Sequence, residues 1–445
     1  MNYRTMMSMF AAGTALATMT LTSIDAQAGA LALREQSAVG QGMSFAGAGT
    51  PGMGLSAMFW NPAAVTQATG LWAETHISGI MPNSTLHADP GTSAQLLALG
   101  QTSDNGHPAL VGSSYYAYQF NPALYFGLSV TAPYGLGTGV SAPFATQQLS
   151  VKSQALAIDV NPVIGWKVSE SLSIAAGPRG MWFRGWFTRA GAAINPAIVP
   201  SMAYLDVDDI GWGWTAGLTW KPMVGTEIAL GYRSRVKLDL EGHIDTPPGA
   251  AVTGTNSVSG NVTLPDQATL GVRQRLTDAF TLLGTVEWTN WNLVQAVPFT
   301  FTSGRAVGAT VTTLTFNLRD GWFFAAGGEY NWSPTTVLRA GIGYEISPVT
   351  DPIRDPAIPD ANRWWFSGGI THMIAPNWTI DVGFSYIVVN NAPINVVPGH
   401  PDFANLNAPP FGQLQFVGHN DSNIAIISVG LRYKFGADAP LITKN

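Results

Sequence analysis

Cysteine is absent from the 445-residue chain. Its absence excludes disulfide bonds, thiolate metal sites and cysteine nucleophiles, and it suits an exported protein that has to avoid stray oxidation. Charged residues are scarce as well: they make up 11% of the chain, against roughly 25% in an ordinary soluble domain. A soluble protein of this length needs more charge to cover its surface, so the composition argues against that class.

Basic residues are few and form no block. With a net charge of −6, nucleic acid is excluded as an expected partner, because binding its phosphates takes clustered Lys and Arg. Beyond the first residues, no uncharged apolar run reaches the roughly 18 residues of a membrane-spanning helix. Glycine and the aromatic residues, in contrast, are plentiful, with 49 Gly, 15 Trp, 12 Tyr and 20 Phe.

The first 28 residues predict a signal peptide for export. A basic start is followed by the apolar stretch Met6–Thr22 and by a small-residue cleavage site at 26–28. The alternative is a membrane anchor that is retained. An exported chain with little charge, many aromatics and no spanning helix leaves one membrane option, because only a closed β-barrel satisfies its backbone inside lipid.

Residues 29–69 are dense in Gly and Ala and end shortly after Asn61-Pro62-Ala63. Neither a helical nor a strand period persists in this stretch, and glycine at this density weakens both structures. The stretch is too apolar for a solvated tail and cannot fold alone. We therefore expect a plug that packs inside the barrel formed by residues 70–436, with residues 437–445 as a tail.

Segments of alternating polar and apolar residues recur from residue 70 onwards. In Thr226–Glu241 one face is apolar and the other carries six charges, so the pattern predicts that all six face the lumen. The apolar set is Ile228, Leu230, Tyr232, Val236, Leu238 and Leu240, and the charged set is Glu227, Arg233, Arg235, Lys237, Asp239 and Glu241.

The connections between these segments alternate between short turns and long loops, as in outer-membrane barrels. Counting the segments gives about fourteen antiparallel strands, an even number as such barrels require. The expected strands start near Gly70, Ala109, Ala123, Val151, Ser171, Asp206, Thr226, Val258, Ala279, Asp320, Thr335, Asn362, Asn377 and Asn423.

Several motifs in this order resemble the long-chain fatty-acid transporter family of Gram-negative outer membranes. They are the Gly-rich stretch ending in NPA, GYRSRVKLDLEG (Gly231–Gly242), TLPDQATLGV (Thr263–Val272), EWTNW (Glu287–Trp291), Asp320–Val349 and IPDANRWWFSGGI (Ile358–Ile370). The resemblance implies a monomeric fourteen-stranded barrel with an N-terminal plug in the outer membrane. It implies passive transport of fatty acids or aromatic hydrocarbons, from an extracellular groove to a lumen pocket and sideways into the membrane lipid, without a cofactor.

The resemblance places the lateral opening in the third strand, Ala123–Tyr134. Glycine and proline interrupt a strand, since proline gives no ladder donor and glycine marks a bend. In the family the Asn of the plug's NPA contacts an inward kink in this strand, whereas by itself Asn-Pro only starts a turn. The expected gate residues are Asn61, Pro62, Phe126, Gly127 and Pro133.

A pocket for a fatty acid needs apolar walls and one or two donors for the carboxylate. Arg363 is the expected donor with Ser367 on the same face, and family members carry an Arg at this place. The alternative is an interior Arg paired with a carboxylate across the lumen. By resemblance, Leu31 and Leu33 are expected to contact the buried ligand tail.

The extracellular groove is expected in the loop Gly191–Leu205, because an apolar exposed loop indicates binding; a loop that merely caps the barrel is the alternative. The residues singled out there are Ile194, Ile198, Val199 and Met202.

No catalytic group is expected, and the seven histidines show no metal-binding spacing. The alternatives to fatty-acid transport are an aromatic-hydrocarbon channel, a surface adhesin or receptor, and an outer-membrane lipid hydrolase. The sequence leaves open whether the lateral opening is permanent or gated.

Overall fold

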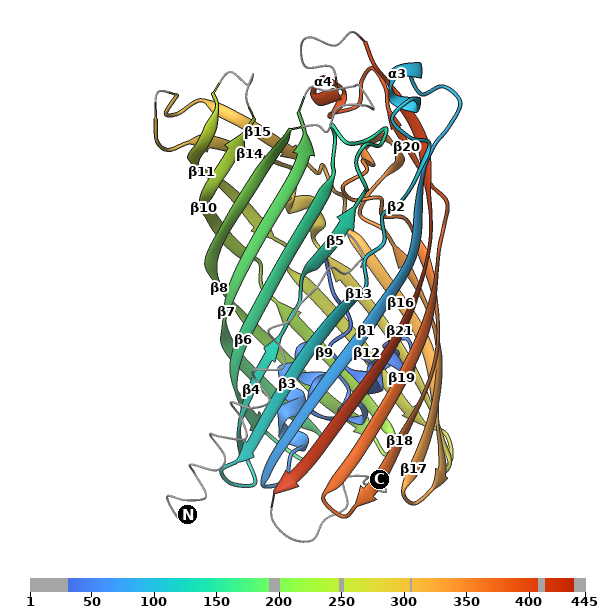
Figure 1. The fold of residues 1–445 in the computed structure, drawn as a ribbon. Coiled ribbons are helices and arrows are strands. Elements are labelled where there is room, and N and C mark those ends of the chain that lie inside the picture. The colour runs from blue at the N-terminus through green and yellow to red at the C-terminus, as the bar shows by residue number, and fades with distance from the viewer. Residues whose placement is uncertain (1–30, 192–200, 248–251, 305, 407–412, 436–445) are drawn as a thin grey trace.

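The computed structural model describes residues 31–191, 201–247, 252–304, 306–406 and 413–435. Its strands form one antiparallel sheet in which the first strand, β1 (Leu71–Ala88), pairs with the last, β21 (Phe416–Phe435). This pairing closes the sheet into a barrel, shown in Figure 1. Closure gives the backbone polar groups partners within the wall, as lipid requires.

Fourteen spans make the wall, as the sequence predicts. Three of them consist of two consecutive strands separated by a break. The spans are β1, β3 (Ala109–Gln119), β4 (Leu124–Thr131) with β5 (Gly135–Gly139), β6 (Lys152–Lys167), β7 (Leu172–Ala190), β8 (Met202–Met223), β9 (Thr226–Arg233) with β10 (Val236–Thr246), β11 (Gly254–Leu264) with β12 (Gln267–Arg275), β13 (Phe280–Thr289), β16 (Gly321–Ser333), β17 (Thr336–Ile346), β18 (Arg363–Ala375), β19 (Trp378–Val389) and β21.

The remaining elements extend the end of the barrel that carries the long loops. No helix in the described ranges is long and apolar enough to cross a membrane. These extensions are β2 (Thr102–Asp104), β14 (Ala296–Phe301), β15 (Thr310–Thr315), β20 (Ala392–Val396), the α-helices α3 (Ala94–Leu97) and α4 (Phe403–Leu406), and the 3-10 turns η4 (Trp291–Leu293) and η5 (Asp351–Ile353).

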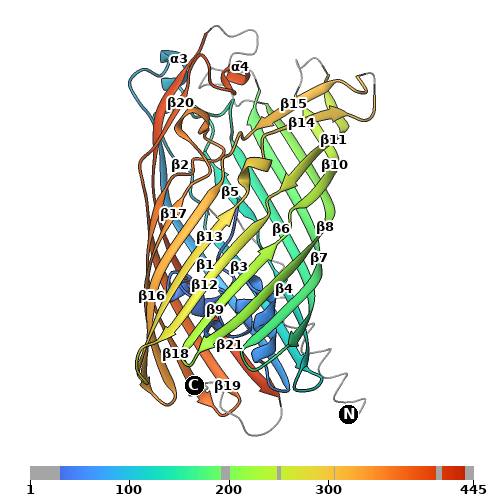
Figure 2. The same cartoon turned by 180° about the vertical axis from the view of Figure 1, so that it is seen from behind.

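The strand predicted over Thr226–Glu241 is divided into β9 and β10, which follow each other in the wall as Figure 2 shows. In β9 the predicted faces are confirmed, because Glu227 and Arg233 are buried and Leu230 is exposed. The pairing with β8 then shifts by one residue, from Thr215↔Arg233 to Asp208↔Glu241. A shift of one residue turns every following side chain to the opposite face.

The predicted faces are therefore wrong for β10. Its apolar side chains point into the lumen and are buried, and its charged side chains are exposed on the outside. The buried residues are Val236, Leu238 and Leu240, and the exposed ones are Lys237, Asp239 and Glu241. Arg235 lies in the break itself and pairs with Asp266, 2.8 Å away, at the corresponding break between β11 and β12.

Residues 31–69 fill the lower half of the lumen, where Figure 1 shows them in blue. They contain α2 (Ala38–Gln41), η2 (Pro51–Phe59) and η3 (Pro62–Gln67), and nearly all their side chains are buried. The plug backbone touches the wall at glycines. A Cβ added to Gly231 would lie 1.7 Å from the Trp60 carbonyl oxygen, and one added to Gly271 would lie 1.9 Å from that of Ala48.

Candidate functional site

The lumen above the plug is divided into a polar layer and an apolar chamber. The polar layer is a buried ion-pair cluster in which Asp159 accepts from Arg179 at 2.7 Å and from Arg233 at 3.3 Å. Above the breaks at Ser234 and Asp266 a cluster of lumen-facing residues is apolar. It includes Leu31, Tyr134, Leu136, Phe183, Leu205, Leu238, Leu240, Phe299, Phe301 and Ile358.

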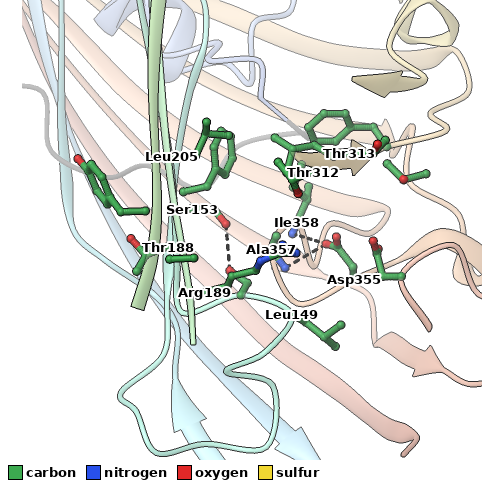
Figure 3. Close-up of a pocket in the computed structure, with 18 of the residues that line it drawn as sticks. Leu149, Ser153, Thr188, Arg189, Leu205, Thr312, Thr313, Asp355, Ala357 and Ile358 are labelled. Carbon is green, nitrogen blue, oxygen red and sulfur yellow. Dashed lines mark hydrogen bonds between the residues drawn. The ribbon is translucent and has the colours of Figure 1, made fainter. Parts of the chain in front are cut away.

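A cavity opens from this chamber at the long-loop end and is shown in Figure 3. It holds about 790 Å³ of empty space, including its open mouth. Most of its wall is apolar or carries threonine, and Arg189, at the end of β7, is the basic residue that lines it. No hydrogen bond or ion pair joins the Arg189 guanidinium to a residue in the described ranges. A cation in such a wall can bind an anionic group of a ligand.

Two carboxylates, Asp355 and Asp402, line the same cavity. Asp355 lies in a loop beyond the membrane-spanning strands and accepts hydrogen bonds from the amides of Ala357 (3.0 Å) and Ile358 (2.9 Å). Burial, and next the neighbouring Asp402, raise the pKa of Asp355 to about 7. Asp402 is the carboxylate whose charge acts on the Arg189 guanidinium.

The wall has a window between β3 and β4. β3 pairs with β4 only from Ser114↔Val130 to Gln119↔Tyr125, and among the described residues its earlier part, 109–113, pairs with β1 alone. Opposite that part, the chain leaves the ladder at residues 132–134, between β4 and β5. Higher up, the bridge Gly106↔Thr138 joins the two edges again.

The first described residues lie against this window. The Leu33 amide donates to the Pro133 carbonyl at 2.9 Å, and the Gly135 amide donates to the Leu31 carbonyl at 2.8 Å. Leu31 packs in the apolar chamber, whereas Leu33 belongs to the core around the plug. The contact of Leu31 and Leu33 with a ligand tail stays a prediction.

Gln36 joins the two edges of the window. On the β3 side, its backbone carbonyl accepts hydrogen bonds from Ser113 Oγ at 2.8 Å and from Tyr115 Oη at 3.0 Å. On the other side, its side-chain amide donates to the Ala132 carbonyl at 2.7 Å and accepts from the Ala132 amide at 3.2 Å. Sequence reasoning missed Gln36, which has no motif around it.

Phe126 and Gly127 do not form the break in the wall. Both are paired on either side, with β3 and with β6, and the break begins only after Thr131, where Pro133 lies. Glycine at 127 has another cause: an added Cβ would lie 2.5 Å from Met58 Cε and 2.8 Å from Val65 Cγ2 of the plug. The break lies near Pro133 because proline supplies no amide to the ladder.

Asn61 and Pro62 begin η3 and lie against β8 instead of the third strand. The Asn61 side chain accepts from the Ala63 amide at 3.0 Å, which caps the turn, and donates to the Leu218 carbonyl at 3.0 Å and to Thr219 Oγ1 at 2.9 Å. Pro62 follows at the first position of η3. Asn61 thus fastens the plug to the wall, and the expected contact with an inward kink is replaced by one with β8.

Arg363 and Ser367 face the lumen from β18, but both are engaged within the protein. The Arg363 guanidinium pairs with Asp360, three residues away, and lies 3.9 Å from an oxygen of Glu345, its register partner on the adjacent strand. The arginine is thus paired in the interior, but with neighbouring carboxylates instead of one across the lumen. Ser367 Oγ bonds to Ser44 of the plug at 2.7 Å and to Ser385 at 2.6 Å. Neither residue lines the cavity at Arg189.

The expected outer groove is only partly covered by the structure. Ile194, Ile198 and Val199 lie outside the described residues. Met202 begins β8, pairs with Ala190 and does not line the cavity, whereas Tyr204 and Leu205 do. One sequence feature could have pointed to Arg189. It lies between the aromatic residues at the end of β7 and the apolar loop that follows.

The opposite end of the barrel holds a second, polar space. It is lined by the plug and by the short turns and contains several charged groups, among them Glu227, Arg273 and Glu329. Its empty volume is about 2010 Å³, including its opening to solvent. An apolar molecule gains nothing by entering a space lined with charged groups.

The chain matches the family described as outer membrane protein transport protein (OMPP1/FadL/TodX) over residues 19–435. It is 26% identical over 416 residues to the long-chain fatty acid transport protein of Salmonella typhi, covering 85% of this chain and 92% of the relative. To outer membrane protein P1 of Haemophilus influenzae it is 25% identical over 412 residues, covering 83% and 88%.

Solved structures share the architecture. The crystal structure of a Pseudomonas aeruginosa FadL homologue superposes with a TM-score of 0.78 at 21% identity, covering 92% of this chain and 100% of that chain. The Ralstonia pickettii toluene transporter TbuX gives 0.66 at 18% identity, covering 90% and 100%. These likenesses establish the fold. The chain belongs to the OMPP1/FadL/TodX family, whose members are non-enzymatic barrels of the outer membrane that transport hydrophobic compounds.

Proposed function

We propose that this protein takes up long-chain fatty acids, binding them first in the cavity at Arg189. The observation that carries the proposal is a basic side chain without an ion-pair partner among the described residues, set in a largely apolar wall. A hydrocarbon needs no cation, whereas a fatty acid places a carboxylate at one end of an apolar chain. A hydrogen bond to a charged group contributes about 1.5–3 kcal/mol.

The same proposal includes a lateral exit. Below the apolar chamber lie the ion-pair layer at Asp159, the plug and the charged space at the short turns. The window between β3 and the break at 132–134 lies beside Leu31 of the chamber instead. An apolar molecule that leaves through the window reaches membrane lipid without crossing water. Each barrel has its own cavity, plug and window, so a monomer is sufficient.

An aromatic-hydrocarbon substrate is the second candidate, and the aromatic side chains Phe187, Tyr204 and Phe316 in the cavity wall favour it. The two candidates differ in whether the ligand can accept a hydrogen bond from Arg189. The carboxylate of a fatty acid uses the guanidinium, whereas toluene offers it no acceptor.

The test measures binding and uptake of labelled oleate and toluene in an outer membrane without other such transporters. Arg189→Gln should weaken oleate binding at least tenfold, since about 1.4 kcal/mol is a factor of ten, and leave toluene uptake unchanged. The matched control is Arg184→Gln, a residue of the same strand that faces outward and pairs with Asp206.

Toluene uptake without oleate uptake would move the substrate class to hydrocarbons. Equal oleate binding by Arg189→Gln and the wild type would refute the role of Arg189. Uptake of neither compound would refute both candidates.

A further inference from the structure

His87 and His419 face each other across the seam that closes the barrel. They are direct partners in the register of β1 and β21, near the long-loop end of these two strands, which Figure 1 shows side by side. Their imidazole rings stack with centroids 4.7 Å apart and planes 8° apart. Both side chains lie on the outer face of the wall and are about one-third exposed, 31% and 29%.

Asp421, two residues after His419, completes a triangle of ligand atoms. Its Oδ2 lies 3.9 Å from His87 Nε2 and 3.7 Å from His419 Nε2. In a tetrahedral zinc site with bonds of about 2.0–2.1 Å, neighbouring ligand atoms lie about 3.3 Å apart. Because the two rings lie in nearly parallel planes, a shared ion requires both partly exposed imidazoles to tilt out of the stack. The Asp421 side chain, 65% exposed, is free to turn toward the same ion.

A fourth residue orients one of the two imidazoles. Asp89 Oδ2 lies 2.7 Å from His419 Nδ1. A proton on Nδ1 then points at Asp89, which leaves a free lone pair on Nε2, 3.7 Å from Asp421 Oδ2. A carboxylate that holds the far nitrogen in this way is the usual outer partner of a metal-binding histidine, because it fixes the tautomer and raises the basicity of the ligand.

We propose that His87, His419 and Asp421 bind a divalent transition-metal ion of the zinc type, with Asp89 as a positioning residue. Two imidazoles and one carboxylate suit zinc or copper, whereas calcium and magnesium prefer oxygen ligands. The ion joins the first strand to the last at the extracellular end of the seam. The site is separate from the transport path, since it lies on the outer face and none of its residues lines the cavity.

The test uses the purified full-length protein in detergent, with Zn²⁺ as the probe in titration calorimetry. The wild type should bind one ion per barrel, and His87→Ala and His419→Ala should each weaken binding at least tenfold. Asp89→Asn should weaken it as well, in the 10–100-fold range typical of outer partners. His372→Ala, an exposed strand histidine bonded to Thr336, is the matched control and should leave the affinity unchanged.

Copper provides a second measurement. The electron paramagnetic resonance spectrum of the Cu²⁺-loaded wild type should show coupling to two nitrogen ligands, and His87→Ala should reduce it to one. Retained heat-dependent mobility on gels identifies folded variants. Equal Zn²⁺ affinity of the wild type and the His87→Ala/His419→Ala variant would overturn the proposal. An equal loss of affinity in His372→Ala would overturn it too.

Discussion

At the scale of the single residue, the position of a charge relative to its partners decides what it can do. Arg363 and Arg189 both point inward, but Arg363 is held by Asp360 and Glu345, and Arg189 has no such pair among the described residues. Burial of a cation is stable when carboxylates surround it, so Arg363 serves the structure. Arg189 feels the charge of Asp402 without pairing with it, so we expect its N–H groups to be available to a ligand.

The pH dependence of ligand binding follows from Asp355. Its pKa is raised to about 7, so folding favours the protonated form. The stability that this contributes is complete below the ordinary Asp pKa of about 4 and is lost as the pH rises through 7. Above pH 7 Asp355 adds a negative charge near Asp402 in the cavity wall, and this charge repels an incoming carboxylate. Oleate binding should therefore weaken between pH 6 and pH 8.

The measurement compares oleate affinity at pH 6 and pH 8 in the wild type and in Asp355→Asn. The variant should lose most of the pH dependence, because its amide does not ionise in this range. The same dependence in both proteins would assign the effect to the ligand or to another group.

At the scale of the element, breaks in strands determine which side chains face the lumen and where the wall lacks a strand neighbour. A bulge of one residue between β9 and β10 turns apolar side chains from the outer face to the lumen. The same span therefore presents Leu230 of β9 to lipid below the break and Leu238 of β10 to the chamber above it. The break between β4 and β5 instead frees backbone groups, and the N-terminal segment takes them up.

Gln36 is predicted to hold the window closed. Gln36→Leu keeps the size of the side chain but removes both hydrogen bonds to Ala132, each contributing about 0.5–1.5 kcal/mol. Amide hydrogen exchange at Ala132 and Gly135 should become at least tenfold faster. Gln41→Leu is the control, because it removes a plug contact with Ser385 away from the window. Unchanged exchange in Gln36→Leu would show that the window is held by other contacts.

At the scale of the whole molecule, the barrel and the plug are complementary. Wall glycines receive the plug backbone so closely that a methyl group cannot be added without movement. The plug in turn supplies the side chains that seal the lumen and the residues that fill the window. Transport and stability therefore depend on the same contact surface.

Gly271→Ala tests this fit. The new Cβ would lie 1.9 Å from the Ala48 carbonyl oxygen, and overpacking of this kind costs about 1–3 kcal/mol. The variant should unfold at a lower temperature and admit more hydrophilic antibiotic than the wild type. Gly284→Ala, whose Cβ would meet nothing closer than the Ala325 oxygen at 3.9 Å, should do neither. Equal effects of the two substitutions would exclude the plug contact as the cause.

The sequence by itself determined the class of the protein, the fourteen spans and the approximate start of each, because alternation and loop length are local properties. It also determined the lumen face of β9, where Glu227 and Arg233 alternate with apolar residues. Beyond Ser234 the same alternation predicted the wrong face. A bulge of one residue leaves the alternation of apolar and polar residues intact but turns the apolar side chains from the lipid to the lumen.

Only the tertiary structure decided which residues meet. Whether Arg363 or Arg189 has a partner depends on side chains from distant strands, and the window depends on where β3 lacks a neighbour. His87 and His419 are far apart in the sequence, so no spacing rule links them. The closure of the barrel brings them together, because the first strand has the last as its neighbour.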